Sequence, residues 1–349
     1  SRMFMYAGNN AKTWSIGDLS AWDTSQVTSM RGMFLYAGSK TTTWNIGDLS
    51  GWDTSKVTDM GSMFWYAGEN ATTWSVGDLS NWNTSKVTDM SHMFSDAGKN
   101  VATWSVGDLS SWKTSNVTDM ENMFKGAGSS ATTFNLDLSN WDTSKVTDMG
   151  SMFWYAGSKA TTWSVGDLSN WDTSNVKSMR IMFGNAGINA TMWNIGNLSN
   201  WDTSNVTDMY GMFWLAGSSA TTFNLNLSNW NTSNVTTTEG MFYNAGRDAT
   251  TWSVGDLSNW NTSKVTNMSD MFWNASSETV TFSLDLSSWN TSNVTDMSDM
   301  FRSAGSNATT WTVKIPSKTG SLTNTTSKWY GSSSSTYAEP LSGKSFTLS

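Results

Sequence analysis

The chain has 349 residues, no cysteine, a single histidine and a formal charge of −8. The tail after Trp311 has four lysines and one glutamate, a net charge of +3, so the rest of the chain carries −11. An acidic body argues against nucleic acid as a partner, because phosphate binding needs a basic surface. The lack of cysteine excludes disulfides and thiolate metal sites, and no apolar run reaches the length of a membrane span.

The motif Leu-Ser-x-Trp-x-Thr-Ser-x-Val recurs along the chain at intervals of 29 or 30 residues. Such a period predicts a solenoid, in which each unit packs only on its neighbours. The sequence therefore predicts about ten stacked coils. They are marked by the motif tryptophans Trp22, Trp52, Trp82, Trp112, Trp141, Trp171, Trp201, Trp230, Trp260 and Trp289.

Each unit begins with a segment of helical periodicity. Its apolar residues are spaced i, i+3, i+4 and i+7, as in Met60, Met63, Phe64 and Ala67, which is typical of an amphipathic helix. Thr58 or Asp59 is placed to cap the start of this helix, and Gly68 is placed to end it. We expect a helix of two to three turns that packing must stabilise.

The next segment alternates with a period of 2. Trp74 and Val76 face one side while Thr73 and Ser75 face the other, which predicts a short strand. One strand, one loop and one short helix per unit predict an α/β solenoid of the leucine-rich-repeat kind, with a parallel sheet. The alternative is an all-β solenoid, in which Val-Thr-Asp-Met forms a further strand and the Met-Phe segment a turn.

Three units are one residue shorter than the rest. Each of them lacks the glycine that precedes Asp/Asn-Leu-Ser and has phenylalanine in place of the strand tryptophan, at Phe134, Phe223 and Phe282. We expect the glycine to form a bulge or a wide turn, which the short units tighten.

The internal copies separate core columns from surface columns. The Leu, motif Trp, Val and Phe columns do not change, which predicts that they are buried. The residue after each Met-Phe varies widely and is expected on the surface. Large rings in or beside this column could bind a host or matrix protein or a glycan, or could fold over neighbouring coils. They are Trp65, Tyr66, Trp154, Tyr155, Trp214 and Trp273.

The carboxylates recur in three columns, represented by Asp48, Asp53 and Asp59. Stacked acids could bind Ca²⁺, but other units have Asn83, Lys113 or Asn231 at the second of these positions, an exchange that turns and caps tolerate. We expect capping, no catalytic residue, no cofactor and no enzymatic activity. His92, the only histidine, lies in a variable column and is expected on the surface.

The outward residues of the strands form a regular ladder of Thr with Ser or Asn: Thr43/Asn45, Thr73/Ser75 and Thr103/Ser105. A flat hydroxyl ladder could order water, as in ice-binding solenoids. Threonine also suits strands for reasons of local structure alone.

The units Leu-Ser-Asn-Trp-Asp-Thr-Ser-Asn-Val-Thr-Asp-Met and Met-Phe-x-x-Ala closely resemble the BspA-like repeats of bacterial surface proteins, over residues 1 to about 311. The resemblance implies a leucine-rich-repeat-like solenoid that is exported, displayed at the cell surface and adhesive. It implies no catalytic residues. The regular Ala-Gly-x-x-Ala-Thr-Thr-Trp insertion departs from that family and favours a scaffolding role.

Residues 312–349 break the repeat and contain both prolines, Pro316 and Pro340. Alternation at 312–315 and 344–348 predicts strands in a small β-rich cap over the last coil of the 1–311 solenoid. The first residues start in the middle of a unit and show no cap. A second functional hypothesis is therefore self-assembly, head to tail, into an extracellular fibre.

Overall fold

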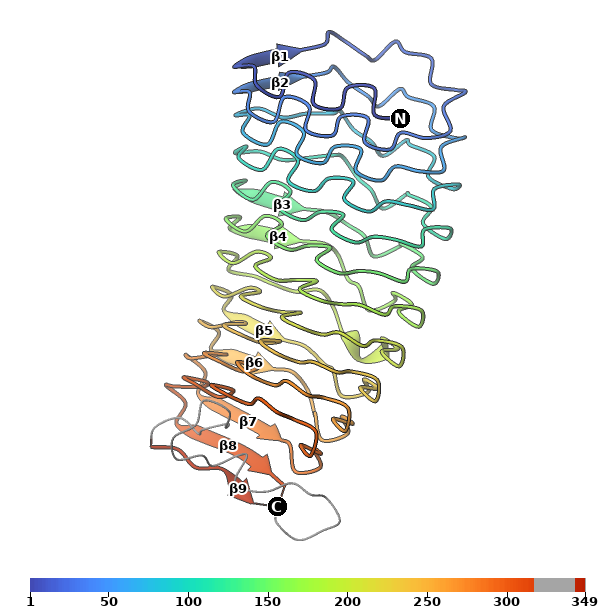
Figure 1. Cartoon of the computed structure of the whole chain (residues 1–349). Helices are drawn as coiled ribbons and strands as arrows, with labels where there is room; N and C mark the ends of the chain where they lie inside the picture. Colours follow the sequence, from blue (N-terminus) through green and yellow to red (C-terminus); the bar gives the residue numbers. More distant parts are fainter. Residues whose placement is uncertain (317–342, 349) are drawn as a thin grey trace.

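The computed structural model describes residues 1–316 and 343–348. The chain winds into an elongated β-solenoid of about eleven turns, with the two termini at opposite ends of the stack (Figure 1). Among the described residues the only helical element is the 3₁₀ turn η1, Leu198–Asn200. The prediction of an α/β solenoid with short helices is therefore wrong, and the all-β alternative describes the fold.

Nine short strands of the described residues lie along one side of the solenoid (Figure 1). They pair in parallel as β1–β2, β3–β4, β5–β6 and β7–β8–β9, and within the repeats the pairs bring the same columns into register, such as Trp14 with Trp44. Their bounds are β1 Thr13–Ser15, β2 Thr43–Asn45, β3 Thr133–Asn135, β4 Thr162–Ser164, β5 Thr222–Asn224, β6 Thr251–Ser253, β7 Thr281–Asp285, β8 Thr310–Ile315 and β9 Thr347–Leu348.

A second parallel ladder runs along the solenoid at the Val-Thr-Asp-Met segment. Single bridges join Ser29 to Asp59 and Asp59 to Asp89, and the same column continues to Asp296. The backbone bonds of this ladder hold each coil to the next, as the all-β alternative predicts for this segment.

The segment predicted to be a helix is a series of turns. The N–H groups of Ser62 and Phe64 donate to carbonyls of the following coil, at 2.7 and 2.9 Å, whereas those of Met63 and Trp65 donate three residues back. Every second N–H therefore leaves the coil, which no α-helix allows. We call residues 61–70 and their counterparts the turn segment.

Left-handed backbone at three places per coil makes this alternation geometrically feasible. Ser62, Tyr66 and Gly68 have φ of 58°, 57° and 56°, and the same columns are left-handed in the other coils. Turns closed over three residues still direct Met60, Met63, Phe64 and Ala67 inward, where all four are fully buried. The apolar residues spaced i, i+3, i+4 and i+7 are therefore all buried although the segment is not a helix.

Stacked aromatic columns fill the core. The motif tryptophans stack with ring centroids 6.1–6.5 Å apart, and the Phe column stacks at 5.4–5.8 Å. Each motif indole from Trp52 onward donates its Nε1–H to a leucine carbonyl of the preceding coil, as Trp52 does to Leu19 at 2.9 Å. The predicted burial of the constant columns is confirmed from coil 2 onward.

The glycine that distinguishes long from short coils forms a left-handed corner. Its φ is 80–87° in all seven long coils with a described corner, and a Cβ on Gly47 would lie 2.2 Å from Oδ1 of Asp18 in the preceding coil. The short coils lack this corner, and there the Leu136 N–H donates to the Ser164 carbonyl at 2.9 Å. Accordingly β3, β5 and β7 lie in the short coils and pair with the coil that follows.

The last described strands extend the sheet past the final repeat. β8 and β9 pair in parallel, and Phe346 is buried against Phe301 and Trp311. These strands agree with the predicted alternation, although β8 begins at Thr310, before the predicted boundary. The rest of the predicted 312–349 segment, residues 317–342 and 349, lies outside the described residues. In the described ranges no helix has the length and apolarity that a membrane crossing requires.

Candidate partner-binding surface

The side chains that follow Met-Phe project from one side of the solenoid. Phe64 and Ala67 point into the core, so the two residues between them, Trp65 and Tyr66, point outward and are half-buried. The same two columns are half-buried or exposed where they hold large rings, and they are buried in some other coils, as at Ser95 and Asn185. We call the surface that these two columns form the turn face. Unlike the core columns, they change from coil to coil.

One group of rings on the turn face spans the first four coils. Tyr6, Tyr36 and Tyr66 form a stack with centroids 5.1 and 4.6 Å apart. Trp65 packs against Tyr66 at 5.8 Å and against His92 of the next coil at 4.5 Å. His92 is therefore half-buried beside a tryptophan, and it is less exposed than the sequence predicts.

A second group spans the eighth to the tenth turn segment. Trp214 stacks on Tyr243 at 4.1 Å and also contacts Tyr210, while Tyr243 contacts Trp273 at 5.2 Å. Trp214 lies over Gly240 of the next coil, where a Cβ would approach its ring to 2.5 Å. Two guanidinium groups lie over the outer rings, Arg180 over Tyr210 at 3.9 Å and Arg302 over Trp273 at 4.5 Å.

Trp154 and Tyr155 lie between these two groups. Their centroids are 5.5 Å apart, and the ammonium of Lys125 lies 4.5 Å from the Trp154 ring. Tyr155 is 42% exposed, the most open of the six rings singled out from the sequence. The six rings therefore share one face, and they belong to three groups along its length.

The structure adds residues to the turn face that the sequence analysis did not single out. Tyr36, Tyr210, Tyr243 and His92 complete the ring contacts. Tyr36 and Tyr243 occupy the same two columns as the predicted rings, so the column pattern contained the signal for them. Tyr210 and His92 lie in the columns that precede Met-Phe, and only the folded turn brings those columns alongside.

A buried carboxylate supports the first ring group. Asp96 is 3% exposed, has left-handed backbone and lies 2.9 Å from the ammonium of Lys99, which also lies 3.8 Å from Glu69. Burial, together with the Asp96 charge, raises the pKa of Tyr66 to about 12. The Tyr66 hydroxyl is thus a neutral hydrogen-bond donor throughout the physiological range. Asp96 is the single aspartate in a column that otherwise holds Tyr, Asn, Gly, Leu or Ser, so the repeat itself gave no indication of it.

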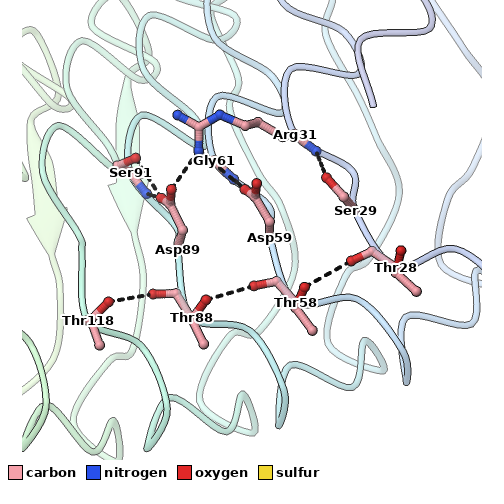
Figure 2. Close-up of polar contacts among 10 residues, drawn as sticks. All are labelled: Thr28, Ser29, Arg31, Thr58, Asp59, Gly61, Thr88, Asp89, Ser91 and Thr118. Carbon is pink, nitrogen blue, oxygen red and sulfur yellow. Dashed lines mark hydrogen bonds and ion pairs between the residues drawn. The ribbon is translucent and has the colours of Figure 1, made fainter.

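A column of carboxylates runs beside the turn face. Oδ1 of Asp59 accepts the N–H of Gly61 at 2.9 Å, and Asp89 accepts the N–H of Ser91 in the same way (Figure 2). The guanidinium of Arg31 reaches both acids, at 3.4 and 2.5 Å (Figure 2). Farther along the column burial raises the pKa of Asp119 and Asp148, and neighbouring acids add to the shift.

The other two acid columns have the same local role. Asp48 accepts the N–H of Ser50 at 2.8 Å, and Asp53 accepts that of Ser55 at 2.9 Å. Hydrogen bonds from Ser55 lower the pKa of Asp53. Asn83 accepts the equivalent N–H at 3.1 Å, which explains why asparagine replaces aspartate in this column. The predicted capping role is confirmed for these acids, as caps of turns instead of helices, and the Ca²⁺ alternative stays a prediction.

Comparison with known proteins places the repeat in a family. Neither a curated protein nor a solved structure matches the chain. Residues 1–100, 69–193, 158–255 and 247–335 each match the family described as Mycoplasma protein of unknown function, DUF285. These segments overlap and together cover every coil, so the chain belongs to the DUF285 family of Mycoplasma proteins of unknown function.

Proposed function

We propose that the chain is a non-catalytic structural and adhesive module that acts outside the cell and binds a protein partner through the turn face. The observation that carries this proposal is the difference between columns. Core columns repeat without change, whereas the columns after Met-Phe hold grouped, half-buried rings in some coils and Lys, Gly or Ser in others. Varied side chains on a constant scaffold are typical of a surface used for recognition.

A structural role fits the way the coils are joined. Aromatic stacks, indole hydrogen bonds and the backbone ladder of the Val-Thr-Asp-Met segment connect each coil to its neighbour, and a second ladder joins the paired strands. The repeated carboxylates accept backbone N–H groups within their own turns. Their positions are therefore accounted for by local structure, without a reaction. Location outside the cell rests on the resemblance to BspA-like repeats, which stays a prediction.

The ring geometry favours a protein over a glycan as the partner. A sugar packs against an open ring face, but the face of Tyr36 is covered on both sides, by Tyr6 and Tyr66. Trp214 is likewise covered by Tyr243. Ring edges, hydroxyls and flanking arginines remain outward, and Trp, Tyr and Arg are the residues that dominate protein interfaces.

The proposal can be tested with wild-type chain, one double variant on the turn face and one control variant. We expect purified chain to bind at least one member of an extracellular-matrix protein panel, and we expect Trp65→Ala with Trp214→Ala to weaken that binding at least tenfold. Met192→Ala removes a side chain that is 72% exposed on the strand side and should leave binding unchanged. Equal binding by all three proteins, or binding to a glycan panel alone, would contradict the proposal. Light scattering of the same samples tests the head-to-tail alternative.

A further inference from the structure

The strand side of the solenoid carries an exposed column that hardly changes. Its members are Thr13, Thr43, Thr73, Thr103, Thr133, Thr162, Thr222, Thr251, Thr281 and Thr310, and the single exception is Met192. All of them are exposed. Two residues further along each strand a second column holds only Ser, Asn or Thr, from Ser15 to Thr312. We call these two columns the strand face.

The uniformity of the strand face is not explained by exposure or by strand propensity. An exposed column elsewhere on the coil accepts Asp53, Asn83 and Lys113. Strand propensity favours threonine, but it does not exclude lysine or glutamate from solvent-facing positions, where charge normally protects a sheet from aggregation. Neither column of the strand face has a charged residue in any coil. An exposed, neutral and regular surface therefore needs a separate explanation.

Hydrogen bonding leaves one set of hydroxyls on this face available. In the adjoining column Thr42 and Thr72 donate to carbonyls of the preceding coil at 3.1 Å, which uses their hydrogens. The hydroxyls of the Thr73 column make no hydrogen bond to protein among residues 1–316 and 343–348. In the second column Asn45 and Ser75 accept the N–H of the corner glycine at 2.9 and 3.3 Å. The hydrogen bond from the glycine holds each side chain in place, and the side-chain N–H of Asn45 and O–H of Ser75 remain as donors at this exposed position.

The backbone sets these groups on a two-dimensional lattice. Identical columns are in register, as Thr133 is with Thr162 and Asn135 with Ser164. Neighbouring strands are about 4.8 Å apart and alternate residues along a strand are about 6.6 Å apart. The buried strand rings stack beneath this face, for example Phe134 on Trp104 at 5.1 Å. A lattice on such a support is preorganised, so a ligand need not order it on binding.

We propose that the strand face binds the surface of ice. An ice surface is uncharged, flat and periodic in two directions, and it consists only of hydrogen-bond donors and acceptors. A neutral array of hydroxyl and amide groups, in register within each group of paired strands, matches the lack of charge and the hydrogen-bonding groups of such a surface. The lack of ring side chains in these two columns disfavours a polysaccharide. The strands lie together on one side of the elongated molecule, which presents them as a single surface (Figure 1). This inference rests on different residues from the turn face and is independent of its partner.

Thermal hysteresis, the difference between the melting and freezing temperatures of ice in a solution of the purified chain, tests the inference. We expect wild-type protein to separate the freezing point from the melting point and to shape ice crystals. Thr133→Tyr with Thr162→Tyr places bulky rings in the centre of the lattice, on β3 and β4, and should reduce the hysteresis at least fivefold. Tyrosine suits strands, so the fold should persist. Circular dichroism checks this, and Thr133→Val with Thr162→Val, which is nearly isosteric, should also lower activity.

The control is Trp65→Ala on the turn face, which should leave hysteresis unchanged. Wild-type hysteresis no greater than that of serum albumin at equal concentration would overturn the inference. Full activity in a folded Thr133→Tyr, Thr162→Tyr variant would also overturn it. Loss of matrix-protein binding in the Trp65 variant, with hysteresis intact, would show that the two surfaces act separately.

Discussion

At the scale of single residues, each motif tryptophan contributes to more than its own coil. Trp171 stacks between Trp141 and Trp201, at 6.5 and 6.3 Å, and its Nε1–H donates to the Leu138 carbonyl of the preceding coil at 3.0 Å. The ring is 2% exposed. A buried indole therefore supplies packing along the stack and a directed bond across it, which is a physical reason for ten unchanged copies.

We predict that Trp171→Phe lowers the free energy of unfolding by about 1–3 kcal/mol, from one lost hydrogen bond and a partly empty ring site. The Leu138 carbonyl keeps the N–H of Trp141 at 3.1 Å, which limits the loss. Urea unfolding measures the change. Trp65→Phe on the turn face is the matched control and should cost less than 1 kcal/mol. Equal costs would contradict a special role for the buried bond.

Asp270 makes stability depend on pH. Burial, with the nearby charges of Asp299, Glu239 and Asp296, raises its pKa to about 6, above the value of about 3.9 in an unfolded chain. Between about pH 4 and pH 6 the folded state binds more protons at Asp270 than the unfolded state does. The contribution of Asp270 to the free energy of unfolding is therefore fully present below about pH 4 and is lost as the pH rises through about 6. Arg302 opposes the shift in part.

We therefore predict that Asp270→Asn raises the melting temperature at pH 7 and changes it little at pH 4. Thermal unfolding at the two pH values, compared with wild type, measures the difference. Asp53→Asn is a suitable control, because hydrogen bonds from Ser55 lower the pKa of Asp53, and its replacement should destabilise at pH 7. An equal rise in melting temperature at both pH values in the Asp270→Asn variant would show that the charge of Asp270 is not the cause.

At the scale of elements, the turn segment shows where sequence periodicity reaches its limit. Spacing of i, i+3, i+4 and i+7 places four side chains on one side of either a helix or a run of three-residue turns. The difference lies in the outward columns, where Gly32, Asn122, Gly211 and Asp270 all have left-handed backbone. Glycine, asparagine and aspartate tolerate that conformation and weaken a helix interior, so their frequency in one column was the signal for a turn.

Ser62→Gly distinguishes the two conformations by the sign of its effect. The φ of Ser62 is 58°, so glycine relieves left-handed strain of about 1–2 kcal/mol against an entropy cost of about 0.5–1 kcal/mol. We predict a net gain of about 0.5 kcal/mol in unfolding free energy, whereas in a helix the change would cost about 0.5 kcal/mol. Ser233→Gly, at a residue without positive φ, should destabilise. Urea titrations of both variants provide the comparison.

The turn face could be found from the sequence only in part. Variation within one column predicted that Trp65, Trp154, Trp214 and Trp273 lie on the surface, and all four are half-buried on one face. Contacts such as Trp65 with His92 depend on how a ring leans toward the next coil. The direction of each ring follows from the left-handed turns, and an α-helix in this segment would have directed the rings differently. Column statistics therefore predict location, and backbone conformation decides which rings meet.

At the scale of the whole molecule, the period in the sequence predicted the register of the coils because stacking aligns identical columns, whereas its count of about ten coils is below the roughly eleven turns of the structure. A parallel sheet was expected as well, but it is divided into four parts, and beyond Thr43 with Thr73 the strands of coils 2 and 3 do not pair. Three of the four parts begin in a short coil, where the chain stays in the ladder past the strand, as the Leu136 N–H does when it donates to the Ser164 carbonyl. The fourth part, β1–β2, joins two long coils, so a corner glycine does not by itself exclude pairing.

The same one-dimensional order predicts that a whole coil can be removed. Deleting residues 91–120 joins Met90 to Glu121 with every column in register, so each ladder closes over the gap. We expect a cooperative, folded chain whose length in solution scattering falls by about 4.8 Å. Deleting residues 91–105 shifts the columns by half a coil and should abolish cooperative unfolding, because Trp and Phe rings would then face solvent. If both deletions unfold alike, the coils depend on more than their neighbours, and nearest-neighbour stacking is not the source of stability.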